Sequence, residues 1–375
     1  MSMRRLIEMS NRYGSDEEYV LLGGGNTSFK ENGVMRVKGS GCALASVVEQ
    51  DFIPMKTAML LDMLKRPYPA DDDAREAEVL ANMMSAKLAY AGADESKRPS
   101  VESILHAIFP RKFGLHLHPP LVNGLSCSKE GERWCADVLG SSVAWAKRAK
   151  PGYLLSMACY DSFRQFSAKH GYAPQVMVLQ NHGIFVSADT VEEIDSLLAD
   201  VMDKLRAGIQ REPLFAVVPQ PPESSQYGSL FRELYTRECG VCEAVFCTNS
   251  QALSFAGDAK AMMPLMLSFT PDHVVYCKGG PLYVQKDEDP SEAFNRFLGD
   301  EGYAPKIVVV QDMGFFALGN TIKEAENARL LFLDAMKIAV YAESFGGSVT
   351  LTRDIIHFMV YWEFEKYRLK VDEND

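Results

Sequence analysis

Two histidines stand two residues apart in the apolar segment GLHLHPP, residues 114–120. In an extended strand, residues i and i+2 face the same side. The spacing therefore predicts that His116 and His118 present their imidazoles side by side, while the leucines between them face the core. Neutral imidazole is a good ligand for Zn²⁺, Fe²⁺ and similar ions. The alternative is a solvated pair of histidines at a strand edge.

A third histidine and a glutamate could complete a metal site. His182 lies in an Asn-His-Gly turn, where the glycine lets another backbone segment come close, although an ordinary turn histidine would look the same. Glu102 follows a proline and a serine at a predicted helix start, a position where a glutamate often only interacts with the helix dipole. Three histidines and one carboxylate would form a mononuclear site in which the carboxylate is a ligand or a base. His106, beside apolar residues, is predicted to be structural.

Two glycine-rich segments precede these residues, and both could bind an anion. Residues 22–29 (LGGGNTSF) and 38–42 (KGSGC) bring backbone N–H groups and small hydroxyls together. Neither segment has the spacing of a Walker loop or of a dinucleotide fingerprint. Each segment alone would also be explained as a tight hairpin turn.

Composition limits the class of protein. The 375 residues include 39 Lys+Arg and 50 Asp+Glu, and the net charge of −11 argues against general nucleic-acid binding. No apolar run approaches the roughly 18 residues of a membrane span, and the N-terminus lacks the apolar stretch of a signal peptide. We therefore expect a cytoplasmic protein whose eight cysteines are free thiols.

The chain repeats part of its own sequence. Residues 171–194 and 302–325 align without gaps at ten identical positions, which suggests a duplicated unit. Each copy reads as an apolar strand, a turn at a glycine, a second strand and an acidic helix start. Met313 stands where the first copy has His182. Because a thioether is a poor ligand for an ion such as Zn²⁺, we expect no metal in the second copy.

Four prolines between residues 210 and 225 predict an extended connector. We therefore expect a metal-dependent catalytic domain at 1–210, a Pro-rich linker at 211–225 and a degenerate repeat lobe without a metal site at 226–375. Strands are predicted at 19–22, 34–38, 113–118 and 274–276, and helices at 78–90, 101–108 and 191–208. Interleaved strands and helices indicate an α/β or α+β class.

Taken together, the motifs resemble those of the class II aldolase/adducin family. GGGNTS, VKGSG, RPSVES followed by LH, LHLHP and QNHGIF occur in that family's order and spacing. The nearest likeness is to the aldolase part of bifunctional rhamnulose-1-phosphate aldolase/alcohol dehydrogenases. It implies an α/β fold, with a three-layer αβα domain, a smaller degenerate lobe and a homo-oligomer. The sequence shows no dinucleotide fingerprint, so we expect no dehydrogenase part in it.

The resemblance also implies roles for individual residues. The family's three metal-binding histidines fall on His116, His118 and His182, and its acidic catalytic residue falls on Glu102. Its phosphate-binding positions fall on Gly25, Asn26, Ser40, Gly41 and Ser100.

Two features depart from the family pattern. Many members have two serines before the glutamate, whereas this chain has Ser100 and Val101, so one phosphate-binding hydroxyl is missing. The tyrosine that the family uses as a proton donor has no clear counterpart here. Tyr153 and Tyr160 are candidates.

The implied activity is that of a metal-dependent aldolase, a carbon–carbon lyase. It would cleave a ketose 1-phosphate of the rhamnulose- or fuculose-1-phosphate type through a metal-stabilised enediolate, with Glu102 as base. The implied cofactor is one divalent metal per chain, first of all Zn²⁺, with Fe²⁺, Mn²⁺ or Co²⁺ as alternatives. The implied partner is a small phosphorylated sugar, not nucleic acid or a membrane. A sugar-phosphate 4-epimerase, dehydratase or decarboxylase on the same fold, and a non-catalytic adducin-like binding module, remain open.

Overall fold

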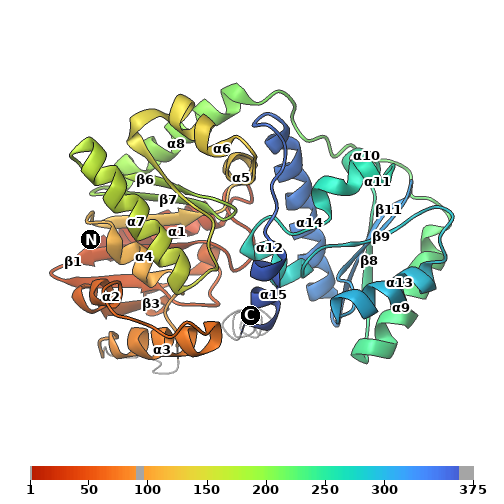
Figure 1. Cartoon of the computed structure of the whole chain (residues 1–375), viewed down its shortest axis with the longest axis horizontal. Coiled ribbons are helices and arrows are strands. Elements are labelled where there is room, and N and C mark those ends of the chain that lie inside the picture. The colour runs from red at the N-terminus through yellow and green to blue at the C-terminus, as the bar shows by residue number, and fades with distance from the viewer. Residues whose placement is uncertain (1, 90–96, 363–375) are drawn as a thin grey trace. The chain divides into compact units, whose positions relative to one another are not determined.

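The structure is a computed structural model that describes residues 2–89 and 97–362. The chain divides into two compact units (Figure 1). Of the described residues, the first unit contains those up to Ser126, Glu130–Gly208, Tyr361 and Trp362, and the second contains Cys127–Lys129 and Ile209–Val360. Residues 211–220, which include two of the four prolines, form neither helix nor strand. Within the described residues, no helix is both long and apolar enough to cross a membrane.

In the described part of the first unit, seven strands form one mixed sheet in the order β3-β2-β1-β4-β7-β6-β5. β5 and β6 pair in parallel, whereas β4 is antiparallel to both of its neighbours, β1 and β7. Every residue of β4, β6 and β7 is buried. The strands are β1 (Asn26–Glu31), β2 (Val34–Lys38), β3 (Phe52–Lys56), β4 (Phe113–Leu117), β5 (Val143–Ala146), β6 (Val176–Leu179) and β7 (Gly183–Ala188).

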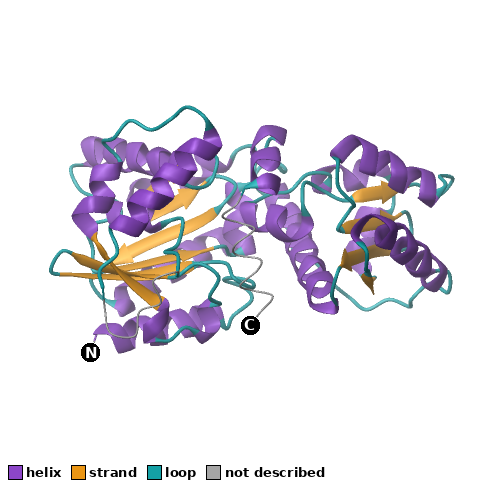
Figure 2. Ribbon diagram, turned by 90° about the horizontal axis from the view of Figure 1, so that it is seen from below, coloured by secondary structure: helices purple, strands orange, loops and turns teal. Residues whose placement is uncertain are grey.

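Helices cover both faces of this sheet (Figure 2), which explains why β4, β6 and β7 are buried along their whole length. One face carries α1 (Ser2–Gly14), α5 (Pro120–Ser126) and α8 (Val191–Gly208); the other carries α2 (Thr57–Met63), α4 (Ser103–Ile108) and α7 (Tyr153–His170). α3 (Asp72–Ser85) and α6 (Gly131–Trp134) complete the unit. The expected three-layer αβα domain is confirmed.

In the described part of the second unit, four strands form a smaller sheet in the order β8-β11-β10-β9. Its strands are β8 (Glu243–Cys247), β9 (Leu282–Val284), β10 (Ile307–Val310) and β11 (Gly314–Gly319). α10 (Ser250–Ala256) and α14 (Ile322–Glu343) pack on one face, and α9 (Ser224–Cys239) and α13 (Pro290–Glu301) on the other. The remaining helices are α11 (Ala259–Met262), α12 (Pro271–Cys277) and α15 (Arg353–Tyr361).

The smaller sheet repeats the half of the larger sheet that contains β4, β7, β6 and β5. In chain order, the first strand (β4 or β8) and the third strand (β6 or β10) both lie antiparallel beside the fourth (β7 or β11). The second strand (β5 or β9) pairs in parallel with the third. The helices that follow the repeats begin alike, because Thr190 and Thr321 each accept a hydrogen bond from a backbone N–H three residues on. The duplication in the sequence is therefore also a duplication in structure.

The turn between the two repeated strands is the same in both units. His182 N–H donates to the Leu179 carbonyl, and Met313 N–H donates to the Val310 carbonyl. The residue before each, Asn181 in one unit and Asp312 in the other, has a positive φ of 56° and 59° respectively. Asparagine and aspartate are the side chains that tolerate this conformation best.

A glycine ends each of these turns because a strand backbone passes against it. A Cβ on Gly183 would lie 2.3 Å from the Leu117 carbonyl oxygen, and a Cβ on Gly314 would lie 2.5 Å from the Cys247 carbonyl oxygen. Both distances are far inside van der Waals contact. The close approach of another backbone that the Asn-His-Gly turn predicted is confirmed.

Two predicted strands are wrong. Residues 19–22 form a turn and an irregular segment ahead of β1. Residues 274–276 belong to α12, which begins with Pro271 in the first turn, a position that suits proline. A short buried apolar run has no periodicity that separates strand from helix. The helix predicted over 78–90 begins earlier, at Asp72, because the Asp71 side chain caps it, and it ends at Ser85. Residue 90 lies outside the described residues.

We expect Gly183→Ala to lower the free energy of unfolding by about 1–3 kcal/mol, the usual effect of overpacking, because its Cβ must push β4 away from the turn. Urea unfolding followed by circular dichroism measures this. Gly299→Ala is the control, since a Cβ at this exposed helical position meets nothing within 4 Å. An unfolding midpoint for Gly183→Ala equal to that of the control would contradict the packing argument.

Candidate metal centre

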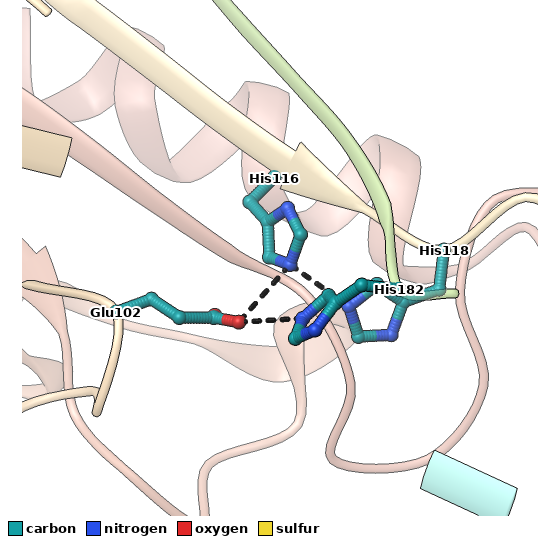
Figure 3. Close-up of side chains that lie close together, drawn as sticks. All are labelled: Glu102, His116, His118 and His182. Carbon is teal, nitrogen blue, oxygen red and sulfur yellow. Dashed lines mark hydrogen bonds and ion pairs between the residues drawn. The ribbon is translucent and has the colours of Figure 1, made fainter. Parts of the chain in front are cut away.

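Glu102, His116, His118 and His182 converge at the C-terminal end of β4 (Figure 3), and their ligand atoms all lie within 4.8 Å of one another. The three imidazole ring centroids form a triangle with sides of 4.7, 5.1 and 5.2 Å. Among the residues that the structure describes, this is the one group of three or more such side chains placed to hold a metal ion. The structure thus brings together the four residues that the sequence singled out.

Three separate segments supply these side chains. His116 lies in β4 and His118 follows its end, where the His118 N–H donates to the Tyr19 carbonyl. His182 comes from the turn between β6 and β7, held beside β4 by the pairing of Leu117 with Ile184. The sheet register, and not proximity in sequence, therefore positions the third histidine.

Glu102 immediately precedes α4, as its N-cap residue. Its side chain makes no capping hydrogen bond with the helix and points towards the imidazoles instead (Figure 3). It is only 7% exposed. A glutamate that merely interacted with the helix dipole would have no reason to be buried in this way.

The orientation of His116 directs its Nε2 into the centre. Its Nδ1 lies 2.9 Å from the Ile184 carbonyl oxygen, which can only accept, so Nδ1 carries a proton and Nε2 faces the centre. Nε2 lies 2.9 Å from His118 Nε2 and 3.3 Å from Glu102 Oε1. His182 Nε2 lies 2.7 Å from the same carboxylate oxygen. Three imidazole nitrogens and one carboxylate oxygen are a donor set that Zn²⁺ and similar ions accept, so the residues fit the expected cofactor.

The electrostatics of the centre favour its metal-binding state. Burial raises the pKa of Glu102, but the charge interaction with His116 and the hydrogen bonds with His116 and His182 outweigh burial and hold this pKa well below its usual value. Burial lowers the pKa of His182, against the hydrogen bond with Glu102. An ionised carboxylate and a neutral imidazole are the protonation states that metal binding requires.

Backbone hydrogen bonds join the predicted phosphate-binding segments. Gly39 bridges to Pro99, Ser40 N–H donates to the Arg98 carbonyl, and Ser100 N–H donates to the Lys38 carbonyl. The Ser100 hydroxyl in turn accepts from Glu102 N–H at 3.2 Å. The second glycine-rich segment therefore reaches the residues just before Glu102.

The first glycine-rich segment runs into β1, which lies beside β4. Asn26 pairs with His116 across β1 and β4. Gly25 has a φ of +65°, and a Cβ there would lie 3.0 Å from the His116 carbonyl oxygen. Gly41, in the second segment, has a φ of +84°. Glycine tolerates such angles without steric strain.

Sequence reasoning missed Lys38, whose side chain is only 2% exposed. Its ammonium group donates to the Cys42 carbonyl, which fixes a positive charge inside the second glycine-rich segment. An anion held near Ser40 would be attracted to this charge. The signal in the sequence was a lysine that ends an apolar strand directly before glycines.

Two predicted site residues have partners of their own in the structure. The Tyr153 hydroxyl donates to the backbone carbonyls of Met63 and Arg66, and the residue is only 7% exposed, so it serves as a packing residue. The Asn26 carboxamide is hydrogen-bonded to Glu102 and His106, so Asn26 stays a predicted phosphate-binding residue whose side chain already has two partners.

Comparison with known proteins identifies the family. Residues 4–199 match the family described as Class II Aldolase and Adducin N-terminal domain. The chain belongs to this family. The matched residues of this class II aldolase/adducin domain include all four members of the candidate metal centre.

Three individual proteins to which this chain is similar share only a minority of its residues. The Bacillus subtilis protein named "Uncharacterized oxidoreductase YuxG" is 24% identical over an alignment of 424 residues that covers 98% of this chain and 58% of the relative. A class II aldolase domain from Thermoplasma acidophilum is 26% identical, with a TM-score of 0.46, over 55% of this chain and 93% of that one. The L-fuculose-1-phosphate aldolase of Thermus thermophilus is 15% identical, with a TM-score of 0.34, over 54% of this chain and 92% of that one.

We expect the purified protein to hold one divalent ion per chain and His118→Ala to lose it, because the substitution removes one of the three imidazoles that converge on the centre. Elemental analysis after dialysis measures the ion. His357→Ala, at an exposed histidine of α15, is the control and should keep full metal content. Equal metal content in all three proteins would contradict the assignment.

We expect the second unit to bind no catalytic metal, because Met313 packs in an apolar cluster with Phe246 and Phe316. Met313→Leu nearly conserves volume and should change stability by less than about 1.5 kcal/mol. Metal content and turnover should stay at the wild-type level. A second tightly bound ion per chain, or lost activity in a folded Met313→Leu variant, would show that this unit carries chemistry.

Proposed function

We propose that this chain is a metal-dependent class II aldolase that cleaves a ketose 1-phosphate of the rhamnulose- or fuculose-1-phosphate type. The observation that carries the proposal is the buried group of three histidines and one carboxylate, in a chain of this family, next to two glycine-rich segments. The name of the Thermus relative, an L-fuculose-1-phosphate aldolase, supports this substrate class.

Glu102 is the base in this proposal. A divalent ion held by His116, His118 and His182 would supply a Lewis acid that polarises the substrate carbonyl. Glu102 takes the proton from the hydroxyl on the carbon that becomes the aldehyde, and the bond between this carbon and its neighbour breaks. The electron pair stays with the carbonyl-bearing fragment as an enediolate, to which Glu102 returns the proton. Glu102 is ionised before the reaction, as a base must be.

The phosphate group would bind at the glycine-rich segments. Gly25 and Gly41 offer backbone N–H groups, and Ser40 and Ser100 offer hydroxyls. The buried ammonium group of Lys38 adds a positive charge. Binding energy at the phosphate then orients the distant reacting carbons. With Val101 in place of a second serine, the site has one hydroxyl fewer than many family members.

A second candidate is an epimerase, dehydratase or decarboxylase acting on a similar sugar phosphate, because the same ion and base serve those reactions. Within the aldolase reading, we propose that the chain is closest to the aldolase part of bifunctional rhamnulose-1-phosphate aldolase/alcohol dehydrogenases. The word oxidoreductase in the name of the Bacillus relative supports this, although the chain spans only 58% of that protein.

Incubation with a panel of ketose 1-phosphates, with detection of dihydroxyacetone phosphate, tests the proposal. Cleavage of at least one six-carbon member is the expected result. Formation of an epimer, a dehydrated product or CO₂ without cleavage would favour the second candidate. No reaction by the metal-loaded protein with any substrate would contradict both candidates.

We expect Glu102→Gln to keep its metal and to lower kcat by about 10²–10⁴-fold, the usual contribution of a general base. The substitution keeps the size of the side chain and the three histidine ligands. Parallel measurement of bound metal and of kcat separates the two effects. A near-normal kcat would show that Glu102 is not the base.

A further inference from the structure

His106 is completely buried and hydrogen-bonded to two side chains of β1. Its Nδ1 lies 2.7 Å from Ser28 Oγ, and its Nε2 is hydrogen-bonded to Asn26 Oδ1. The amide nitrogen of the same Asn26 side chain donates to Glu102 Oε2. We propose that His106 is a positioning residue that orients the Glu102 carboxylate through Asn26, instead of a residue that only fills the core.

The chemistry of the groups gives this chain of hydrogen bonds one direction. An ionised carboxylate only accepts, so the NH₂ group of Asn26 faces Glu102 and its carbonyl oxygen faces His106. His106 must then carry its proton on Nε2. Its Nδ1 is left to accept from the Ser28 hydroxyl. The donor of each of these three hydrogen bonds therefore lies on the side away from the carboxylate and points towards it. Each hydrogen bond orients the group that donates the next one.

The surroundings hold His106 in this orientation. A Cβ on Gly114 would lie 2.9 Å from Ser28 Oγ and 3.0 Å from His106 Nδ1, so only glycine leaves room for this pair beneath β4. The ring of Phe185 stands edge-on to the imidazole, with the centroids 4.8 Å apart. Ser28 and His106 are both 0% exposed, so bulk water does not reach either of them.

The two carboxylate oxygens of Glu102 therefore have different partners. Asn26 holds Oε2, while Oε1 faces His182 at 2.7 Å and His116 at 3.3 Å. One oxygen is thus presented to the centre and the other is kept out of it. Without the N–H of His106, the Asn26 carboxamide would be free to rotate and the carboxylate would lose this orientation. The catalytic part of the inference rests on the proposed function of Glu102 as base.

Two substitutions of His106 separate positioning from packing. The amide nitrogen of His106→Gln can occupy the place of Nε2 and donate to Asn26. The shorter His106→Asn can accept from Ser28 at the place of Nδ1, but it does not reach Asn26. We expect His106→Asn to lower kcat by about 10–100-fold, as is usual for groups that orient a metal centre, with little change in KM. His106→Gln should restore most of kcat.

A double-mutant cycle with Glu102 tests whether the effect travels through the carboxylate. In the Glu102→Gln background, His106→Asn should cause almost no further loss of kcat, because the group that it positions is already gone. A merely structural role of His106 would instead multiply the two losses. Equal kcat values for His106→Asn and His106→Gln in the wild-type background would also overturn the proposal.

Two readouts do not depend on turnover, so they remain valid if the proposed function is wrong. Long-range ¹H–¹⁵N NMR of the metal-free wild-type protein should show His106 as the Nε2–H tautomer, and the Nδ1–H tautomer would overturn the proposal without requiring any variant to fold. With Co²⁺ as probe, the visible absorption spectrum should change in His106→Asn and not in His106→Gln. Identical spectra for the two variants would overturn the proposal as well.

Discussion

The burial of one carboxylate among three imidazoles is the interaction on which the rest of the centre depends. An isolated buried charge is very unfavourable, and loss of one partner from a buried pair typically costs about 3–5 kcal/mol. Glu102 is therefore compensated on both sides, by His116 and His182 at one oxygen and by Asn26 at the other. Because these partners come from β1, β4 and the β6–β7 turn, the centre forms only when the central strands have paired.

The scaffold itself does not require the metal. The second unit repeats the same strands and the same turn with other side chains at the ligand positions. His116 pairs with Phe185 on β7, and Phe246 pairs with Phe316 at the matching positions of β8 and β11. Phe246 and Met313 join an apolar cluster there. The close approach of a strand backbone to a turn glycine is preserved in both units. The same arrangement of strands and turn therefore supports a polar centre in the first unit and apolar core packing in the second.

The sequence predicted those parts of the centre that depend on local spacing. The i, i+2 pair of His116 and His118, the turn that carries His182 and the burial of the repeated strands follow from local patterns. Glu102 was proposed from its place at a predicted helix start, and the resemblance to the family assigned it the catalytic role. The partners of Asn26 could not be predicted in this way, since Glu102 and His106 lie 76 and 80 residues further along the chain. Such contacts depend on how α4 packs on the sheet, and this packing cannot be read from the spacing of residues along the sequence.

X-ray absorption at the zinc edge, on protein loaded with one equivalent of Zn²⁺, tests the central claim most directly. The account predicts a first coordination shell of three imidazole nitrogens and one oxygen at about 2.0–2.2 Å. The outer-shell scattering should be that of three rigid imidazole rings. A sulfur ligand at about 2.3 Å, fewer than three imidazoles, or no tightly bound zinc would contradict the account.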